Sequence, residues 1–104
     1  MKKVSVSPRA REDFKAALSW YYEADPRVSR RFLQAVKDCI ARIAAAPRRF
    51  PQRSHGARRL LVPKFPYQIY YSDGESSVEI IAIVHSRRHP DAWREGFEAN
   101  DRRD

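Results

Sequence analysis

The sequence predicts an α+β domain in which an antiparallel helical hairpin packs on a mostly antiparallel four-stranded sheet. Three observations lead to this prediction. Residues 8–46 contain two successive amphipathic helical patterns, each opened by a capping residue and a proline. Residues 58–84 contain three strand-like segments, and a short alternating segment before the helices supplies the fourth strand.

The 104 residues have room for one domain, residues 1–104, whose tail after about residue 97 is charged and expected to be frayed. A single cysteine, Cys39, excludes an intramolecular disulfide and is expected to be a buried thiol in a reducing compartment. The N-terminus lacks the apolar run of a signal peptide, and no stretch approaches the length of a membrane span. These features predict a cytoplasmic protein.

The first strand and the first helix are predicted from residues 3–24. Val4 and Val6 alternate with polar residues, which is typical of a strand. Ser7 followed by Pro8 is a helix start signal, because serine caps the first turn and proline suits the first helical position. Apolar residues then recur at helical spacing on one face: Ala10, Phe14, Ala17, Leu18 and Tyr21.

The second helix follows at once. Asp25 and Pro26 repeat the start signal, and Pro47 cannot continue the helix beyond a run of alanines. One apolar stripe runs through it: Val28, Phe32, Ala35, Val36, Cys39, Ile40 and Ile43. Because the connection between the helices is so short, we expect them to pack side by side as an antiparallel hairpin.

The last third of the chain predicts a three-stranded meander. Its segments are residues 58–62, 67–72 and 78–84, with an Asp73-Gly74 hairpin turn between the last two. The final segment is apolar on both faces, which is typical of a central strand. Simple alternation puts Val78, Ile80, Ala82 and Val84 on one face and Glu79, Ile81 and Ile83 on the other. A short C-terminal helix is expected after Pro90.

The charge distribution indicates an anionic partner. The formal net charge is +8, and the sequence pI is about 10.1. No acidic residue lies between Asp38 and Asp73, where seven cationic residues fall: Arg42, Arg48, Arg49, Arg53, Arg58, Arg59 and Lys64. Because such an excess repels itself unless it is paired, we expect nucleic acid or an acidic protein as the partner.

Four segments, in this order, resemble the RelE/ParE superfamily of bacterial type II toxin–antitoxin toxins. They are VSVSPRAREDF at residues 4–14, AAAPRRFP at 44–51, GARRLLVPKFPYQIYY at 56–71 and VEIIAIVHSRRHPDAW at 78–93. The last segment, an apolar strand that ends in histidine, arginine, proline and tryptophan, is the most distinctive. The resemblance covers the chain from Val4 to about Phe97 and implies a RelE/ParE-like fold.

The resemblance also implies a toxin that a cognate acidic antitoxin neutralises by wrapping the helices and the sheet, in a hetero-oligomer. Trp20, Tyr21 and Tyr22 cannot all face one core, so at least one is expected on the surface. The candidate residues for binding the antitoxin or the target are Arg48, Arg49, Arg53, Arg58, Arg59, Arg87, Arg88, Trp20, Tyr22 and Trp93. We expect the arginines to gather at one margin of the meander.

The superfamily works in two ways, which leaves two mechanisms open. RelE-like members cleave messenger RNA on the ribosome, and ParE-like members inhibit DNA gyrase by binding. A nuclease would use His85 as acid or base and Arg87, Arg58 and Arg59 as phosphate clamps. Arginines also occupy the loop at 48, 49 and 53, where family nucleases tend to carry lysines, and no tyrosine or histidine follows Trp93. Because arginine cannot act as a base, the ParE-like function is favoured.

His85 also has a structural interpretation, in which it bonds to neighbouring backbone or holds Trp93 against the sheet. A further alternative is a basic nucleic-acid-binding module without toxicity, although the sequence lacks the usual recognition motifs. His85 and His89 have a spacing that zinc sites use on helices, but no cluster of cysteines or carboxylates completes a site. We therefore expect no metal and no cofactor.

Overall fold

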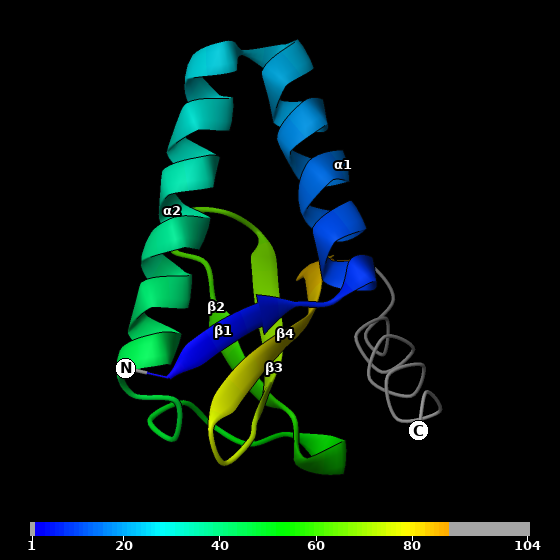
Figure 1. Cartoon of the computed structure of the whole chain (residues 1–104). Helices are drawn as coiled ribbons and strands as arrows, with labels where there is room; N and C mark the ends of the chain where they lie inside the picture. Colours follow the sequence, from blue (N-terminus) through cyan, green and yellow to red (C-terminus); the bar gives the residue numbers. More distant parts are fainter. Residues whose placement is uncertain (1, 88–104) are drawn as a thin grey trace.

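The computed structural model describes residues 2–87 (Figure 1). The predicted C-terminal helix, together with Arg88 and Trp93, lies outside the described residues. The elements follow in the order β1 (Lys3–Val6), α1 (Pro8–Ala24), α2 (Pro26–Ala45), a short 3-10 turn η1 (Ser54–Gly56), β2 (Arg58–Leu61), β3 (Tyr67–Asp73) and β4 (Ser77–His85).

The strands form one sheet in the order β1-β4-β3-β2. β1 runs parallel to β4, whereas β4 with β3 and β3 with β2 are antiparallel. The helices α1 and α2 form an antiparallel hairpin on one face of this sheet, and their connection stands well away from the strands (Figure 1). The predicted α+β architecture is confirmed, including the central position of β4.

Both helix starts are where the sequence predicts them. The hydroxyl of Ser7 accepts a hydrogen bond from the Ala10 N–H at 3.0 Å, and Pro8 is the first residue of α1. Asp25 caps α2 by accepting from the Arg27 N–H at 2.9 Å, with Pro26 as the first residue of α2. The hydrogen bonds from Arg27 lower the pKa of Asp25, which therefore stays ionised as a cap.

The start of α1 also completes the edge of β4 beyond the end of β1. The Ser7 hydroxyl donates to the Ile81 carbonyl at 2.8 Å, and the Asp13 carboxylate accepts from the Ile83 N–H at 3.0 Å. Val6 is the last β1 residue that pairs with β4. Two side chains therefore satisfy backbone groups that a longer β1 would have paired.

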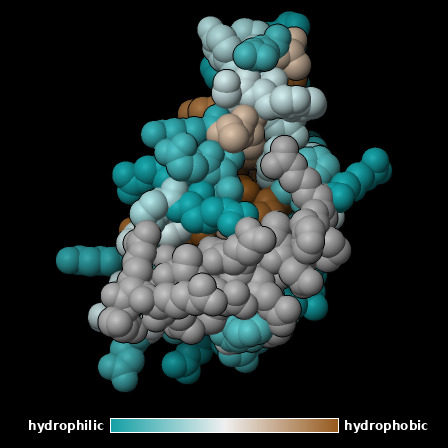
Figure 2. Space-filling model, turned by 90° about the vertical axis from the view of Figure 1, so that its right-hand side faces the viewer, coloured by the Kyte–Doolittle hydropathy of each residue, from teal (hydrophilic) through white to brown (hydrophobic). Residues whose placement is uncertain are grey.

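The helical hairpin is amphipathic, as its sequence pattern predicts. From the α1 side, most of the coloured surface of the molecule is hydrophilic or near neutral, with a few apolar atoms among the hydrophilic ones (Figure 2). On the inner face, Ala10 and Ala17 of α1 are buried, and α2 buries a longer row: Ser29, Phe32, Val36, Cys39, Ile43 and Ala44. The helices therefore pack on the sheet through the stripes that the sequence indicates.

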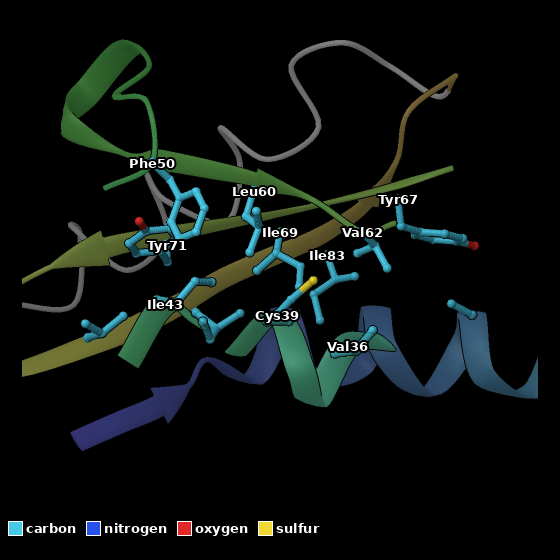
Figure 3. Packing of buried hydrophobic residues seen from close by; sticks show 14 of the residues in the cluster. Val36, Cys39, Ile43, Phe50, Leu60, Val62, Tyr67, Ile69, Tyr71 and Ile83 are labelled. Atoms are coloured by element: carbon cyan, nitrogen blue, oxygen red, sulfur yellow. The ribbon is translucent and has the colours of Figure 1, made fainter. Parts of the chain in front are cut away.

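The main core lies between α2 and the helix-facing side of the sheet. Cys39 and Ile43 project from α2 towards Ile69 and Ile83 of the sheet (Figure 3). Cys39 is only 1% exposed, and this burial raises the pKa of its thiol. The cysteine is a small buried hydrophobe, as predicted.

The alternation predicted for β4 is wrong in its second half, because the strand contains a bulge. Tyr70 pairs with Ala82 but Tyr71 pairs with Ile80, so Ile81 has no partner in β3. One extra residue reverses the sides that the following side chains face. Ile83 therefore joins Val78 in the main core, while Ile81, Ala82 and Val84 belong to a second buried cluster with Ala57 and Tyr70.

The turn between β2 and β3 contains an unusual backbone conformation. Lys64 follows Pro63 and has a φ of 68°, and the Phe65 N–H donates to the Val62 carbonyl at 3.4 Å. Turns with a positive φ at this position usually carry glycine there. Lys64 therefore holds a conformation that disfavours its side chain by roughly 1 kcal/mol.

Candidate functional site

His85 lies at the end of β4, where its imidazole packs against the sheet. The ring of His85 makes an edge contact with the ring of Tyr67, with centroids 5.2 Å apart. Its Nδ1 accepts a hydrogen bond from the Arg87 N–H at 3.1 Å, and the Ser86 N–H donates to the Pro66 carbonyl at 2.7 Å. His85 therefore binds neighbouring backbone and shapes the turn after β4, in agreement with the structural interpretation.

Arg58 and Arg59 are consecutive in β2 and therefore face opposite sides of the sheet. Arg58 pairs with Tyr71, on the helix-facing side, and its Nη1 donates to the Phe50 carbonyl at 2.8 Å. Arg59 pairs with Tyr70, which belongs to the second cluster. The Arg58 guanidinium thus holds the backbone of the preceding loop.

The candidate nuclease residues do not converge. His85 pairs with Tyr67 at one end of β3, whereas Arg58 pairs with Tyr71 near the other end. These positions on β3 are about 13 Å apart along the strand, and β3 itself separates β2 from β4. Arg87 comes two residues after His85, in the turn beyond the end of β4. The expectation that Arg58, Arg59 and Arg87 gather at one margin is wrong.

The remaining candidate arginines of the described chain lie in the loop after α2. Arg48, Arg49 and Arg53 are all exposed. The Arg48 side chain is 85% exposed and lies 3.5 Å from the Asp73 carboxylate. The Lys2 ammonium, 2.6 Å from Asp73, lowers the pKa of that carboxyl by a hydrogen bond. This loop is the largest group of exposed arginines among the predicted site residues.

Trp20 and Tyr22 are the exposed aromatic residues that the sequence predicts at the end of α1, with 66% and 62% of their surface accessible. Tyr21 turns inwards and packs edge-on against Phe65, with ring centroids 5.3 Å apart. The hairpin tip therefore presents two exposed large aromatic side chains next to a half-buried tyrosine. Side chains of this type often anchor protein interfaces.

A groove between α2 and the β2–β3 turn was not predicted. Its volume is about 580 Å³, and Val28, Ala35 and Phe65 contribute apolar lining. Its charged lining residues are the cations Arg31, Arg42 and Lys64 and the single acid Asp38. The sequence pattern assigned Val28 and Ala35 to the core, but both are only half-buried. Because the apolar pattern does not distinguish these two positions from the buried ones, the sequence contained no signal for the groove.

Within residues 2–87, no group of three or more histidine, cysteine, aspartate or glutamate side chains is arranged to hold a metal ion. None of the described helices is long and apolar enough to cross a membrane.

The described residues define the class of this protein as a small basic α+β domain with exposed arginines in the loop after α2 and exposed aromatics at the hairpin tip. The chain belongs to the family of ParE toxins of type II toxin–antitoxin systems, since the family described as ParE toxin of type II toxin-antitoxin system, parDE, matches residues 4–90. It is a toxin component of such a system.

The fold is similar to that of a solved chain described as the chromosomal ParDE TA system from P. aeruginosa. That chain is 16% identical in sequence and superposes with a TM-score of 0.72, over 82% of this chain and 96% of the solved one. Comparison with curated protein sequences gives no match.

Proposed function

We propose that this member of the ParE family acts in the cytoplasm by binding DNA gyrase, and that it has no nuclease chemistry. The separation of Arg58 from His85 along β3 carries the proposal. In-line cleavage of RNA needs an acid, a base and cations around a single phosphate. Arg58 instead donates a hydrogen bond to the Phe50 carbonyl, and His85 accepts a hydrogen bond from the Arg87 N–H.

Toxicity in cells tests this mechanism. Expression of the toxin alone is expected to stop growth, induce the SOS response and leave messenger RNAs intact. His85→Gln, which keeps a hydrogen-bonding side chain of similar reach, is expected to remain toxic. Codon-periodic cleavage of messages that disappears in His85→Gln would overturn the proposal in favour of a ribosome-dependent nuclease. His85→Ala serves as the second variant, with antitoxin binding as a check that it folds.

We further propose that the groove beside α2 receives a segment of the cognate acidic antitoxin. Its apolar lining at Ala35 and Phe65 suits the apolar face of an amphipathic segment. The cations Arg31, Arg42 and Lys64 suit acidic residues on either side of that face. An antitoxin segment that becomes ordered only on binding loses conformational entropy. It needs both the apolar contacts and the charge pairing to offset that loss.

Two neighbouring arginines give a matched test of this docking surface. Arg31 lines the groove, whereas the next residue, Arg30, is exposed and does not line it. Arg31→Glu is expected to weaken antitoxin binding by about 10-fold or more, because it opposes like charges at the interface. Arg30→Glu makes the same charge change and is expected to weaken binding less than about 3-fold. Equal losses of antitoxin affinity in the two variants, measured by titration calorimetry, would show that the antitoxin does not bind in the groove.

A further inference from the structure

The loop from Pro47 to Ala57 carries exposed cations on a backbone that is already fixed. Arg48, Arg49 and Arg53 are exposed, and no acidic residue occurs in the loop. In Figure 1 the loop runs along the end of the molecule opposite the helical hairpin tip, beside the turn between β3 and β4. It is therefore remote from the exposed aromatics of the tip.

Three donors from the sheet hold the backbone carbonyls of this loop. The Tyr71 hydroxyl donates to the Pro47 carbonyl at 2.5 Å, Arg58 Nη1 donates to the Phe50 carbonyl at 2.8 Å, and the Arg59 N–H donates to the Pro51 carbonyl at 3.2 Å. Burial raises the pKa of Tyr71 to about 12, so its hydroxyl keeps its proton. The carbonyls of these three residues are thus engaged by the protein itself.

The loop is also anchored through its one aromatic side chain. Phe50 is 8% exposed and packs in the main core near Tyr71 (Figure 3). The Arg42 guanidinium lies over the Phe50 ring, 5.3 Å from its centroid. The loop is therefore already ordered in the folded protein, so a ligand that binds the exposed arginines does not bear the entropic cost of ordering it.

The nearby carboxylates offset part of this positive charge, and Asp73 pairs with both Lys2 and Arg48. Asp73 is paired with Lys2 at 2.6 Å, and its side chain is only 8% exposed. Glu75 lines a shallow recess with Lys2, Arg48 and Arg49. The recess therefore has three cations and one carboxylate in its lining, and Arg53 adds a further positive charge to the loop.

From these observations we propose that the loop 47–57 binds the phosphodiester backbone of a nucleic acid. Guanidinium groups match phosphate oxygens in charge and in hydrogen-bond geometry. An acidic disordered protein fits this surface less well than the groove beside α2, because the loop exposes three arginines while its main apolar side chain, Phe50, is buried. The proposed activity goes beyond gyrase binding and needs neither gyrase nor antitoxin.

Fluorescence anisotropy with the whole purified toxin tests the proposal. The probes are short duplex DNA, single-stranded DNA and RNA of equal length, with poly-glutamate as an acidic polymer that carries no phosphate. Affinity is measured between about 50 and 200 mM salt, since each phosphate contact contributes about 0.7 to 0.9 to the slope of log affinity against log salt. The three nucleic acids identify which backbone the loop prefers.

Charge-removing and charge-keeping variants locate the contact. Arg49→Gln with Arg53→Gln is expected to reduce the salt slope by about two, whereas Arg49→Lys with Arg53→Lys is expected to keep it. Arg11→Gln with Arg30→Gln removes equal charge from exposed helix positions and is expected to change the slope by less than about 0.5. Equal losses in both glutamine pairs, poly-glutamate binding as tight as DNA binding, or no binding at about 50 mM salt would overturn the proposal.

Discussion

Ser7 shows how one buried side chain joins three elements. Its N–H donates to the Ile80 carbonyl at 2.9 Å, which continues the pairing of β1 with β4. Its hydroxyl caps α1 by accepting from Ala10 and also donates to the Ile81 carbonyl next to the bulge. Because Ser7 is only 1% exposed, water cannot replace these bonds.

Replacement of Ser7 by alanine is expected to lower the free energy of unfolding by about 1–3 kcal/mol. The loss has two parts, the helix cap and an unsatisfied buried carbonyl at Ile81. Urea denaturation measures it, and Ser5→Ala, at an exposed position of β1, is the control with an expected change within about 0.5 kcal/mol. Similar losses in the two variants would show that the Ser7 hydroxyl has no special role.

Asp73 is expected to make the stability of the toxin depend on pH in the acid range. Its pKa in the folded protein lies below the ordinary value of 3.8, chiefly because of the hydrogen bond from Lys2. The ionised form therefore stabilises the fold above pH 3.8, and this contribution disappears as the pH falls through the lowered pKa. Asp73→Asn is expected to be less stable than the wild type at pH 7, with the gap closing towards pH 2. A constant gap in denaturation across this range would contradict the assignment.

Among the elements, local signals in the sequence predicted the helices well and the sheet less completely. The Ser7-Pro8 and Asp25-Pro26 signals placed both helix starts, because capping depends on neighbouring residues. The bulge at Ile81 could not be predicted, since β4 is apolar on both sides and either alternation buries hydrophobic residues. The groove was missed for a related reason, because it depends on where Phe65 sits relative to α2.

The turn at Lys64 gives a test at the scale of the element. Lys64→Gly is expected to change the free energy of unfolding by less than about 0.5 kcal/mol. Glycine removes the backbone strain at a φ of 68°, but it also raises the conformational entropy of the unfolded chain. Lys64→Val is expected to lose about 1–2 kcal/mol, since a β-branched side chain is strongly disfavoured at positive φ. Thermal melts of both variants measure the difference. A valine variant as stable as the glycine variant would contradict the turn geometry.

At the scale of the whole molecule, the fold places the three candidate binding surfaces in different regions. The aromatic tip lies at one end of the helical hairpin, the groove lies beside α2, and the arginine loop lies below the sheet (Figure 1). The sequence predicted the types of residue, but it did not show that β3 keeps Arg58 apart from His85. That separation argues against a joint catalytic role for the two residues.

Supercoiling and cleavage assays with purified DNA gyrase test the central claim most directly. The toxin is expected to inhibit supercoiling and to accumulate gyrase-dependent DNA breaks, and His85→Gln is expected to do so equally well. Prior addition of the antitoxin is expected to abolish both effects. Two results together would contradict the account: the wild-type toxin leaves gyrase unaffected, and it cleaves messenger RNA on ribosomes in a reaction that needs His85.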